Sequence, residues 1–147
     1  PREKAKQINS EWIAHIEDIE LLVFDRLYED ANDILEQIKK TGERIIFLTS
    51  RANEKGLKDE LVRLGLMKYV SELIVVKPDV KNGKISELEK LTEKYDDIIV
   101  IGDTENEYDA AESLGVESYI LHRGFRNREF WRRRGVICPV IVTGYGK

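Results

Sequence analysis

Four groups of polar side chains are of types that can do chemistry, and each group directly follows an apolar run. In chain order they are an acid, two hydroxyls with an arginine, a lysine and an acidic loop, namely Asp25, Thr49-Ser50-Arg51, Lys77 and residues 102–107. Hydroxyls and cations can hold an anion, whereas carboxylates can attack an electrophile or hold a hard metal cation. Any one of these groups is common on a protein surface, but four in the same register form a specific constellation.

The apolar runs before these groups have the length and composition of buried β-strands. Six such runs cover residues 21–24, 45–48, 73–76, 98–101, 118–121 and 140–142. Near-continuous apolar runs are typical of strands that are covered on both faces, so the sequence predicts a mostly parallel sheet.

Helical patterns separate the predicted strands, and their ends are marked by capping residues and glycines. The marked helices run from Asp30 or Asn32 to Gly42, from Asn53 to Gly65, and from about Glu105 to Gly115. Repeated strand, helix and strand with short connections predict right-handed crossovers and a doubly wound, three-layer α/β sheet of Rossmann type. Ligands of such sheets bind beyond the carboxyl ends of the strands, so we expect the four polar groups to converge there.

The order of these groups resembles the haloacid dehalogenase-like hydrolases over about residues 20–121. The best segments are residues 47–50, 100–111 and 114–116. Since only short helices follow Asp25 and Thr49, the resemblance implies a member without an inserted cap domain.

The resemblance implies a role for each group in phosphate ester hydrolysis. Asp25 would attack phosphorus and form an aspartyl-phosphate, while Thr49 and Lys77 would hold phosphoryl oxygens, with Ser50 and Arg51 beside them on the substrate side. The acidic loop would hold the metal cofactor, Mg²⁺. In that loop Asp103 would share the ion with Asp25, and Glu107 would bind it through water or orient Asp103.

The first motif departs from the family pattern. The family expects a second Asp two positions after the first, as general acid and base, and this chain has Leu27 there. Alignment with the family pattern also implies a deletion of about three residues from the turn that follows. Glu29 or Asp30 could substitute for the missing acid, but we favour a solvated position or a helix cap for both.

Composition predicts one globular domain over residues 1–147. Its parts are an N-terminal amphipathic helix over 1–19, expected to pack beside the sheet, a core sheet over 20–121, and an arginine-rich helix with a final strand over 122–147. With 41% hydrophobic and 35% charged residues, the chain is too apolar for disorder and has no run long enough for a membrane span. A lone Cys138 and a charged beginning favour a soluble, cytoplasmic protein.

Residues 122–134 carry six arginines, one acid and aromatic side chains, against a net charge of -4 for the whole chain. This mixture suits nucleic acid binding through phosphates and stacked bases. A solvated helix whose arginines pair with acids elsewhere is the alternative, and we favour it because the domain as a whole is acidic.

The sequence therefore predicts a Mg²⁺-dependent phosphohydrolase acting on a small or macromolecular phosphomonoester. The alternative is a catalytically degenerate module of the same fold that binds or interacts, in which case nucleic acid is a candidate partner. A homo-oligomer is possible in either case.

Overall fold

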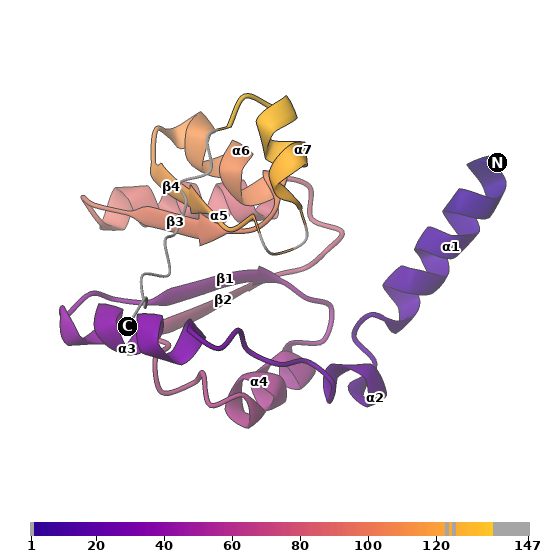
Figure 1. The fold of residues 1–147 in the computed structure, drawn as a ribbon, viewed down its shortest axis with the longest axis horizontal. Helices are drawn as coiled ribbons and strands as arrows, with labels where there is room; N and C mark the ends of the chain where they lie inside the picture. The colour runs from indigo at the N-terminus through magenta and orange to yellow at the C-terminus, as the bar shows by residue number, and fades with distance from the viewer. Residues whose placement is uncertain (1, 123, 125, 137–147) are drawn as a thin grey trace. The chain divides into compact units, whose positions relative to one another are not determined.

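The computed structural model describes residues 2–122, 124 and 126–136, which form two compact units (Figure 1). The first unit comprises residues 1–81 and the second residues 82–147. We describe each unit by itself. The predicted strand at 140–142 and Cys138 lie outside the described residues, and the single domain over residues 1–147 stays a prediction.

Unit 1 contains four helices and two parallel strands. In chain order these are α1 (Arg2–His15), α2 (Ile19–Leu22), α3 (Ala31–Lys40), β1 (Ile46–Ser50), α4 (Glu54–Arg63) and β2 (Glu72–Val76). Strands β1 and β2 pair in parallel, with Ile46 opposite Glu72 and Ser50 opposite Val76. The crossover through α4 thus joins two neighbouring parallel strands, as the sequence predicts.

The core of unit 1 lies between α4 and one face of the strand pair. Leu57 and Leu61 of α4 are buried with Leu66 and Tyr69, and Phe47 of β1 packs against this cluster. Because side chains alternate along a strand, Thr49 shares the face of Phe47, whereas Ser50 belongs to the opposite face. The core therefore fixes which strand-end hydroxyl lies on the α4 side.

The strand predicted over residues 21–24 is wrong. Residues 19–22 form helix α2, and a turn follows in which Phe24 donates to the Leu21 carbonyl at 3.0 Å. Phe24 is 72% exposed, so the run is not buried on both faces. Four apolar residues are too few for their pattern to separate a strand from a short helix.

Helix α1 covers residues 2–15 of the opening helix predicted over 1–19, and two of its apolar side chains are exposed. Ile8 and Trp12 are 58% and 51% exposed, so the expected packing of this helix beside the sheet is not observed.

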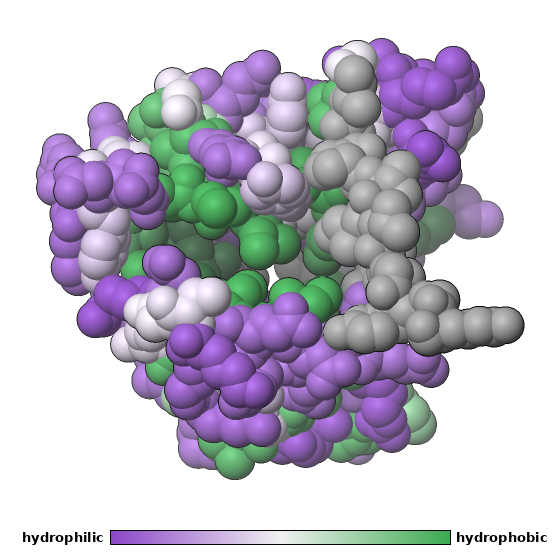
Figure 2. Space-filling model, turned by 60° about the vertical axis from the view of Figure 1, so that its left-hand side comes forward, coloured by the Kyte–Doolittle hydropathy of each residue, from purple (hydrophilic) through white to green (hydrophobic). Residues whose placement is uncertain are grey.

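Charged and polar residues cover most of the surface seen in Figure 2, with apolar patches between them.

The described residues of unit 2 form three helices and a second parallel pair of strands. Its elements are α5 (Gly83–Lys94), β3 (Ile99–Gly102), α6 (Glu105–Leu114), β4 (Glu117–Ile120) and α7 (Arg128–Arg133). Ile99 pairs with Glu117 and Gly102 with Ile120. Helix α6 joins the two strands, packs on both and on α5, and buries Ala110 and Ala111.

The ends of α6 follow the sequence signals. Thr104 caps its start, and Gly115 ends it in the left-handed conformation with φ of 67°. That conformation is costly for residues with a Cβ, which explains the glycine. Among the described residues, none of the helices has both the length and the apolar composition that a membrane span requires.

Candidate functional site

The strand ends of unit 1 bring two of the predicted groups together. Thr49 and Ser50 are the last residues of β1, and the Arg51 amide donates to the Val76 carbonyl of β2 at 3.1 Å. Arg51 and Lys77 therefore leave neighbouring strands at the same edge. Lys77 is exposed, so its ammonium group can reach a ligand at this edge. The backbone register thus places residues 49–51 and Lys77 at the carboxyl ends of neighbouring strands, and the anion site expected there stays a prediction.

Asp25 does not follow a strand, because the segment before it is helix α2 and a turn. Its backbone carbonyl accepts from the Arg63 guanidinium at 3.4 Å, and its carboxyl lies beside Glu60 of α4. Burial, together with a hydrogen bond shared with Asp25, raises the pKa of Glu60, although Arg51 opposes this. The structure therefore places the Asp25 carboxyl beside Glu60 of α4, which also lies 3.7 Å from Arg51 after β1.

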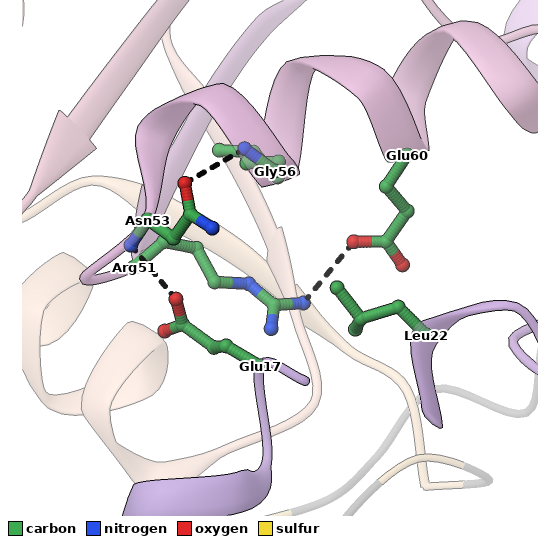
Figure 3. Close-up of a pocket in the computed structure, with 7 residues that line it drawn as sticks. Glu17, Leu22, Arg51, Asn53, Gly56 and Glu60 are labelled. Atoms are coloured by element: carbon green, nitrogen blue, oxygen red, sulfur yellow. Dashed lines mark hydrogen bonds and ion pairs between the residues drawn. The ribbon is translucent and has the colours of Figure 1, made fainter. Parts of the chain in front are cut away.

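A small pocket beside the start of α4 contains acids that the sequence reasoning missed (Figure 3). Its lining residues are Glu17, Leu22, Arg51, Asn53, Gly56, Leu57 and Glu60. The Glu17 carboxylate accepts from the Ala52 and Asn53 amides at 2.9 and 2.8 Å. It thus occupies backbone donors at the start of a helix, where negative charge is stabilised.

Glu60 is the buried acid of this pocket, with 9% exposure. Its Oε2 lies 3.7 Å from an Arg51 nitrogen, and none of the described residues hydrogen-bonds to it. The place of Glu60 between Leu57 and Leu61 on the apolar side of α4 was the available sequence signal. Glu17 had no such signal, because its partners are 35 and 36 residues away.

The acidic loop of unit 2 follows β3, as predicted. Asp103 is the first residue after β3, and Thr104 forms a capping box with Glu107. Glu107 Oε1 also accepts from Lys84 Nζ at 2.5 Å. Burial opposes ionisation of Glu107, but hydrogen bonds from Lys84 and Thr104 outweigh it and lower its pKa. The structure therefore uses Glu107 to hold the loop.

Asp103 stays the predicted magnesium ligand of this loop. Mg²⁺ is commonly bound by one or two carboxylates, with waters and substrate phosphate oxygens as its other ligands. Both Glu107 oxygens are taken by Lys84 and Thr104. No three His, Cys, Asp or Glu side chains gather for a metal within the part of the chain that the structure describes. Because Asp25 and Asp103 belong to different units, the cation they were expected to share stays a prediction.

Four of the described arginines of the basic segment pair with acids. Arg126 binds Glu105, Arg132 and Arg133 bind Glu129, and Arg134 binds Asp109. Hydrogen bonds from Arg126 lower the pKa of Glu105 to about 2. These pairs support a structural face rather than a nucleic acid surface.

The family of the chain follows from a match that covers most of its length. The family sequence model of the haloacid dehalogenase-like hydrolases matches residues 2–121. The chain belongs to this family. No curated protein matches the chain significantly.

Solved structures of this haloacid dehalogenase-like fold resemble the chain at low sequence identity. A predicted phosphatase from Clostridium acetobutylicum has a TM-score of 0.62 and 24% identity, covering 74% of this chain and 52% of that one. A haloacid dehalogenase-like family hydrolase from Streptococcus pneumoniae has a TM-score of 0.60 and 16% identity, and the match covers 76% of this chain and 53% of that one. Protein Tyrosine Kinase A from Mycobacterium tuberculosis has a TM-score of 0.60 and 16% identity, and the match covers 74% of this chain and 52% of that one.

These likenesses show an α/β fold of Rossmann type, in agreement with the parallel strand pairs. This haloacid dehalogenase-like chain spans about half the length of those three structures. Since one is described as a phosphatase and another as a kinase, the shared fold does not determine the reaction. The reaction has to be argued from the strand-end residues.

Proposed function

We propose that the chain acts as a Mg²⁺-dependent phosphohydrolase on a phosphomonoester, through an aspartyl-phosphate. The observation that carries this proposal is the common edge of Thr49-Ser50-Arg51 and Lys77 at the end of a parallel strand pair, in a member of a hydrolase family. Hydroxyl and ammonium groups at that edge suit a phosphoryl group. We expect a cytoplasmic protein and an accessible phosphate ester as substrate.

Each residue group has one task in this proposal. Thr49 and Lys77 bind phosphoryl oxygens, and the charge of Lys77 favours the trigonal phosphorus that develops during displacement. Ser50 and Arg51 adjoin the substrate. Asp103 holds Mg²⁺, which when bound supplies further positive charge at the phosphoryl oxygens.

The proposed nucleophile is Asp25, which would bond to phosphorus as the bond from phosphorus to the ester oxygen breaks. Water would protonate the leaving oxygen, and a second water would then hydrolyse the aspartyl-phosphate, releasing phosphate and restoring Asp25. This role rests on the family resemblance, because the strand-end argument no longer applies to Asp25. Leu27 cannot supply the proton, so turnover should be slow. General acid and base assistance contributes about 10²–10⁴-fold, and aryl phosphates depend on it least because they leave easily.

The test is Mg²⁺-dependent hydrolysis of an aryl phosphate by the purified chain, with an alkyl phosphate expected to react poorly. Lys77→Met should lower kcat by about 10²–10³-fold, the usual cost of one oxyanion donor. Lys81→Met, another exposed lysine of unit 1, is the matched control and should leave kcat unchanged. Asp103→Asn should abolish the Mg²⁺ dependence.

Asp25→Asn separates the nucleophile from the rest of the proposal. Loss of activity supports Asp25, whereas retained activity that still depends on Lys77 and Asp103 rules Asp25 out. The second candidate is a non-catalytic module, and the position of Asp25 beside Glu60 favours it. Absence of both hydrolysis and phosphate-analogue binding at saturating Mg²⁺ would select that module.

A further inference from the structure

We propose that Gly124 and residues 126–134, here called the arginine clasp, hold the Asp103 loop in its position, and that Arg126 is a positioning residue for Asp103. The proposal that the arginine clasp holds the Asp103 loop rests on contacts within unit 2. Only the naming of Mg²⁺ as the ion held by Asp103 rests on the proposed function.

The first contact joins the clasp to the start of α6. Arg126 Nε donates to Glu105 Oε2 at 2.7 Å, and its Nη2 donates to Oε1 at 2.5 Å. Both side chains are about two-thirds or more buried, with 32% and 26% exposure. A paired, two-bond contact of this kind fixes orientation as well as distance. Because Glu105 is two residues after Asp103, the contact restrains the loop.

The second contact joins the clasp to Asp103 itself. A Cβ added to Gly124 would lie 2.6 Å from Asp103 Cγ, and it would meet Asp103 Oδ2 and Cβ more closely still. Real Cβ atoms do not approach so near, so the Gly124 backbone lies directly against the Asp103 side chain. Glycine is needed here for space. The clasp therefore touches the proposed metal ligand without a side chain of its own.

The remaining contacts attach the clasp to the body of α6. Trp131 is fully buried, and its ring meets that of Tyr108 edge-on at 5.9 Å between centroids. Arg134 Nη2 binds Asp109 at 2.6 Å. The Arg126 guanidinium also lies 4.9 Å from the centre of the Phe130 ring. The clasp is thus anchored along the same helix whose first turn carries the capping box.

These contacts leave the clasp poorly suited to polyanions. A nucleic acid phosphate would have to displace Glu105 from Arg126 and Asp109 from Arg134. The basic segment that the sequence left without a role is therefore assigned to the support of Asp103.

The test compares Arg126→Gln with Arg132→Gln in the full chain. Arg132 is the matched control, because it is also paired with a glutamate but within its own helix. Hydrogen exchange of the amides at residues 102–107 should become at least several-fold faster in Arg126→Gln and stay unchanged in Arg132→Gln. In calorimetry, Arg126→Gln should weaken Mg²⁺ binding about 10-fold, the lower end for residues that orient metal ligands.

Arg126→Lys keeps the charge and loses the two-bond geometry, so it should restore little of the protection. It also serves if Arg126→Gln folds poorly. Unchanged exchange at residues 102–107 in both Arg126 variants would overturn the clasp, as would salt-sensitive nucleic acid binding that both glutamine variants weaken equally. If the wild-type chain binds no Mg²⁺ while exchange responds as expected, the proposed function fails and the clasp remains.

Discussion

The loops after β1 and β3 both lead from a strand end into a helix, but they stabilise the start of that helix differently. At the start of α4, Asn53 Oδ1 accepts from the Gly56 amide at 2.9 Å, and the carboxylate of Glu17, which is distant in the sequence, accepts from two more amides. At α6, Thr104 and Glu107 form a capping box within four residues. The start of α4 thus adds a distant carboxylate to a local cap, whereas the capping of α6 itself is local. A sequence pattern can reveal a local cap but not a distant carboxylate.

The largest expected effect concerns whether α6 also needs tertiary support. Trp131→Ala should lower the free energy of unfolding by about 3–5 kcal/mol, because it removes the fully buried ring that joins α7 to α6. Trp12→Ala is the matched control, since Trp12 is 51% exposed, and it should change stability little. Chemical denaturation measures both. If Trp131→Ala changed stability as little as Trp12→Ala, α6 would be stabilised by its cap alone.

The next effect sharpens the contrast between the two caps. Thr104→Ala should cost about 1–2 kcal/mol of unfolding free energy, because it removes the hydroxyl that accepts from the helix start and donates to Glu107, while the backbone half of the capping box remains. Asn53→Ala should cost about 0.5–1 kcal/mol, since Glu17 still satisfies other amides of that helix start. Urea titration of the two variants provides the comparison. A larger loss for Asn53→Ala would reverse it.

A smaller effect tests the distant carboxylate directly. Glu17→Ala should cost about 0.5–1 kcal/mol, because the Ala52 and Asn53 amides would exchange Glu17 for water. Glu11→Ala on the exposed face of α1 is a suitable control. If Glu17→Ala has no effect in thermal unfolding while Asn53→Ala does, the start of α4 is held by its own cap.

The smallest effects are opposite dependences on pH. Glu60 has a raised pKa in the folded chain, so above about pH 4.5 the folded chain keeps a proton on Glu60 that the unfolded chain has lost. The free energy of unfolding therefore falls as pH rises through that region. Glu105 and Glu107 have lowered pKa values, so their contribution is present above pH 4.5. It is lost as pH falls, toward about 2 for Glu105.

Two substitutions distinguish these contributions. Glu60→Gln should remove the loss of stability at higher pH, and Glu105→Gln should remove part of the loss at lower pH. Urea denaturation between pH 3 and pH 8 measures both slopes. The same sign of change in the two variants would contradict the assignment of one pKa shift.

The sequence predicted those parts of the fold that depend on local patterns. The runs before Thr49 and Asp103 both begin with two β-branched isoleucines, which favour a strand, and Asn53 and Gly115 mark helix ends by their own chemistry. Residues 21–24 failed because four apolar residues also fit a short helix that follows Asp18.

Of the candidate site, the sequence identified the residues that leave strands and missed those that act across the chain. The Arg51 and Lys77 edge follows from strand register alone. Glu60 was marked only by its place between Leu57 and Leu61 on the apolar side of α4, whereas Glu17 contacts amides 35 and 36 residues away and could not be recognised from spacing. The same holds for Gly124, whose importance lies in a contact with Asp103 that is 21 residues away.

Gly115 and Gly124 differ in what a substitution would have to overcome. Gly115 has a positive φ and open space around its Cα, so the strain there is torsional and Asn can partly accept it. Gly124 has no room for any Cβ, whatever the side chain beyond it. A library with all residues at each position should therefore return a graded set of survivors at 115, and at 124 almost only glycine.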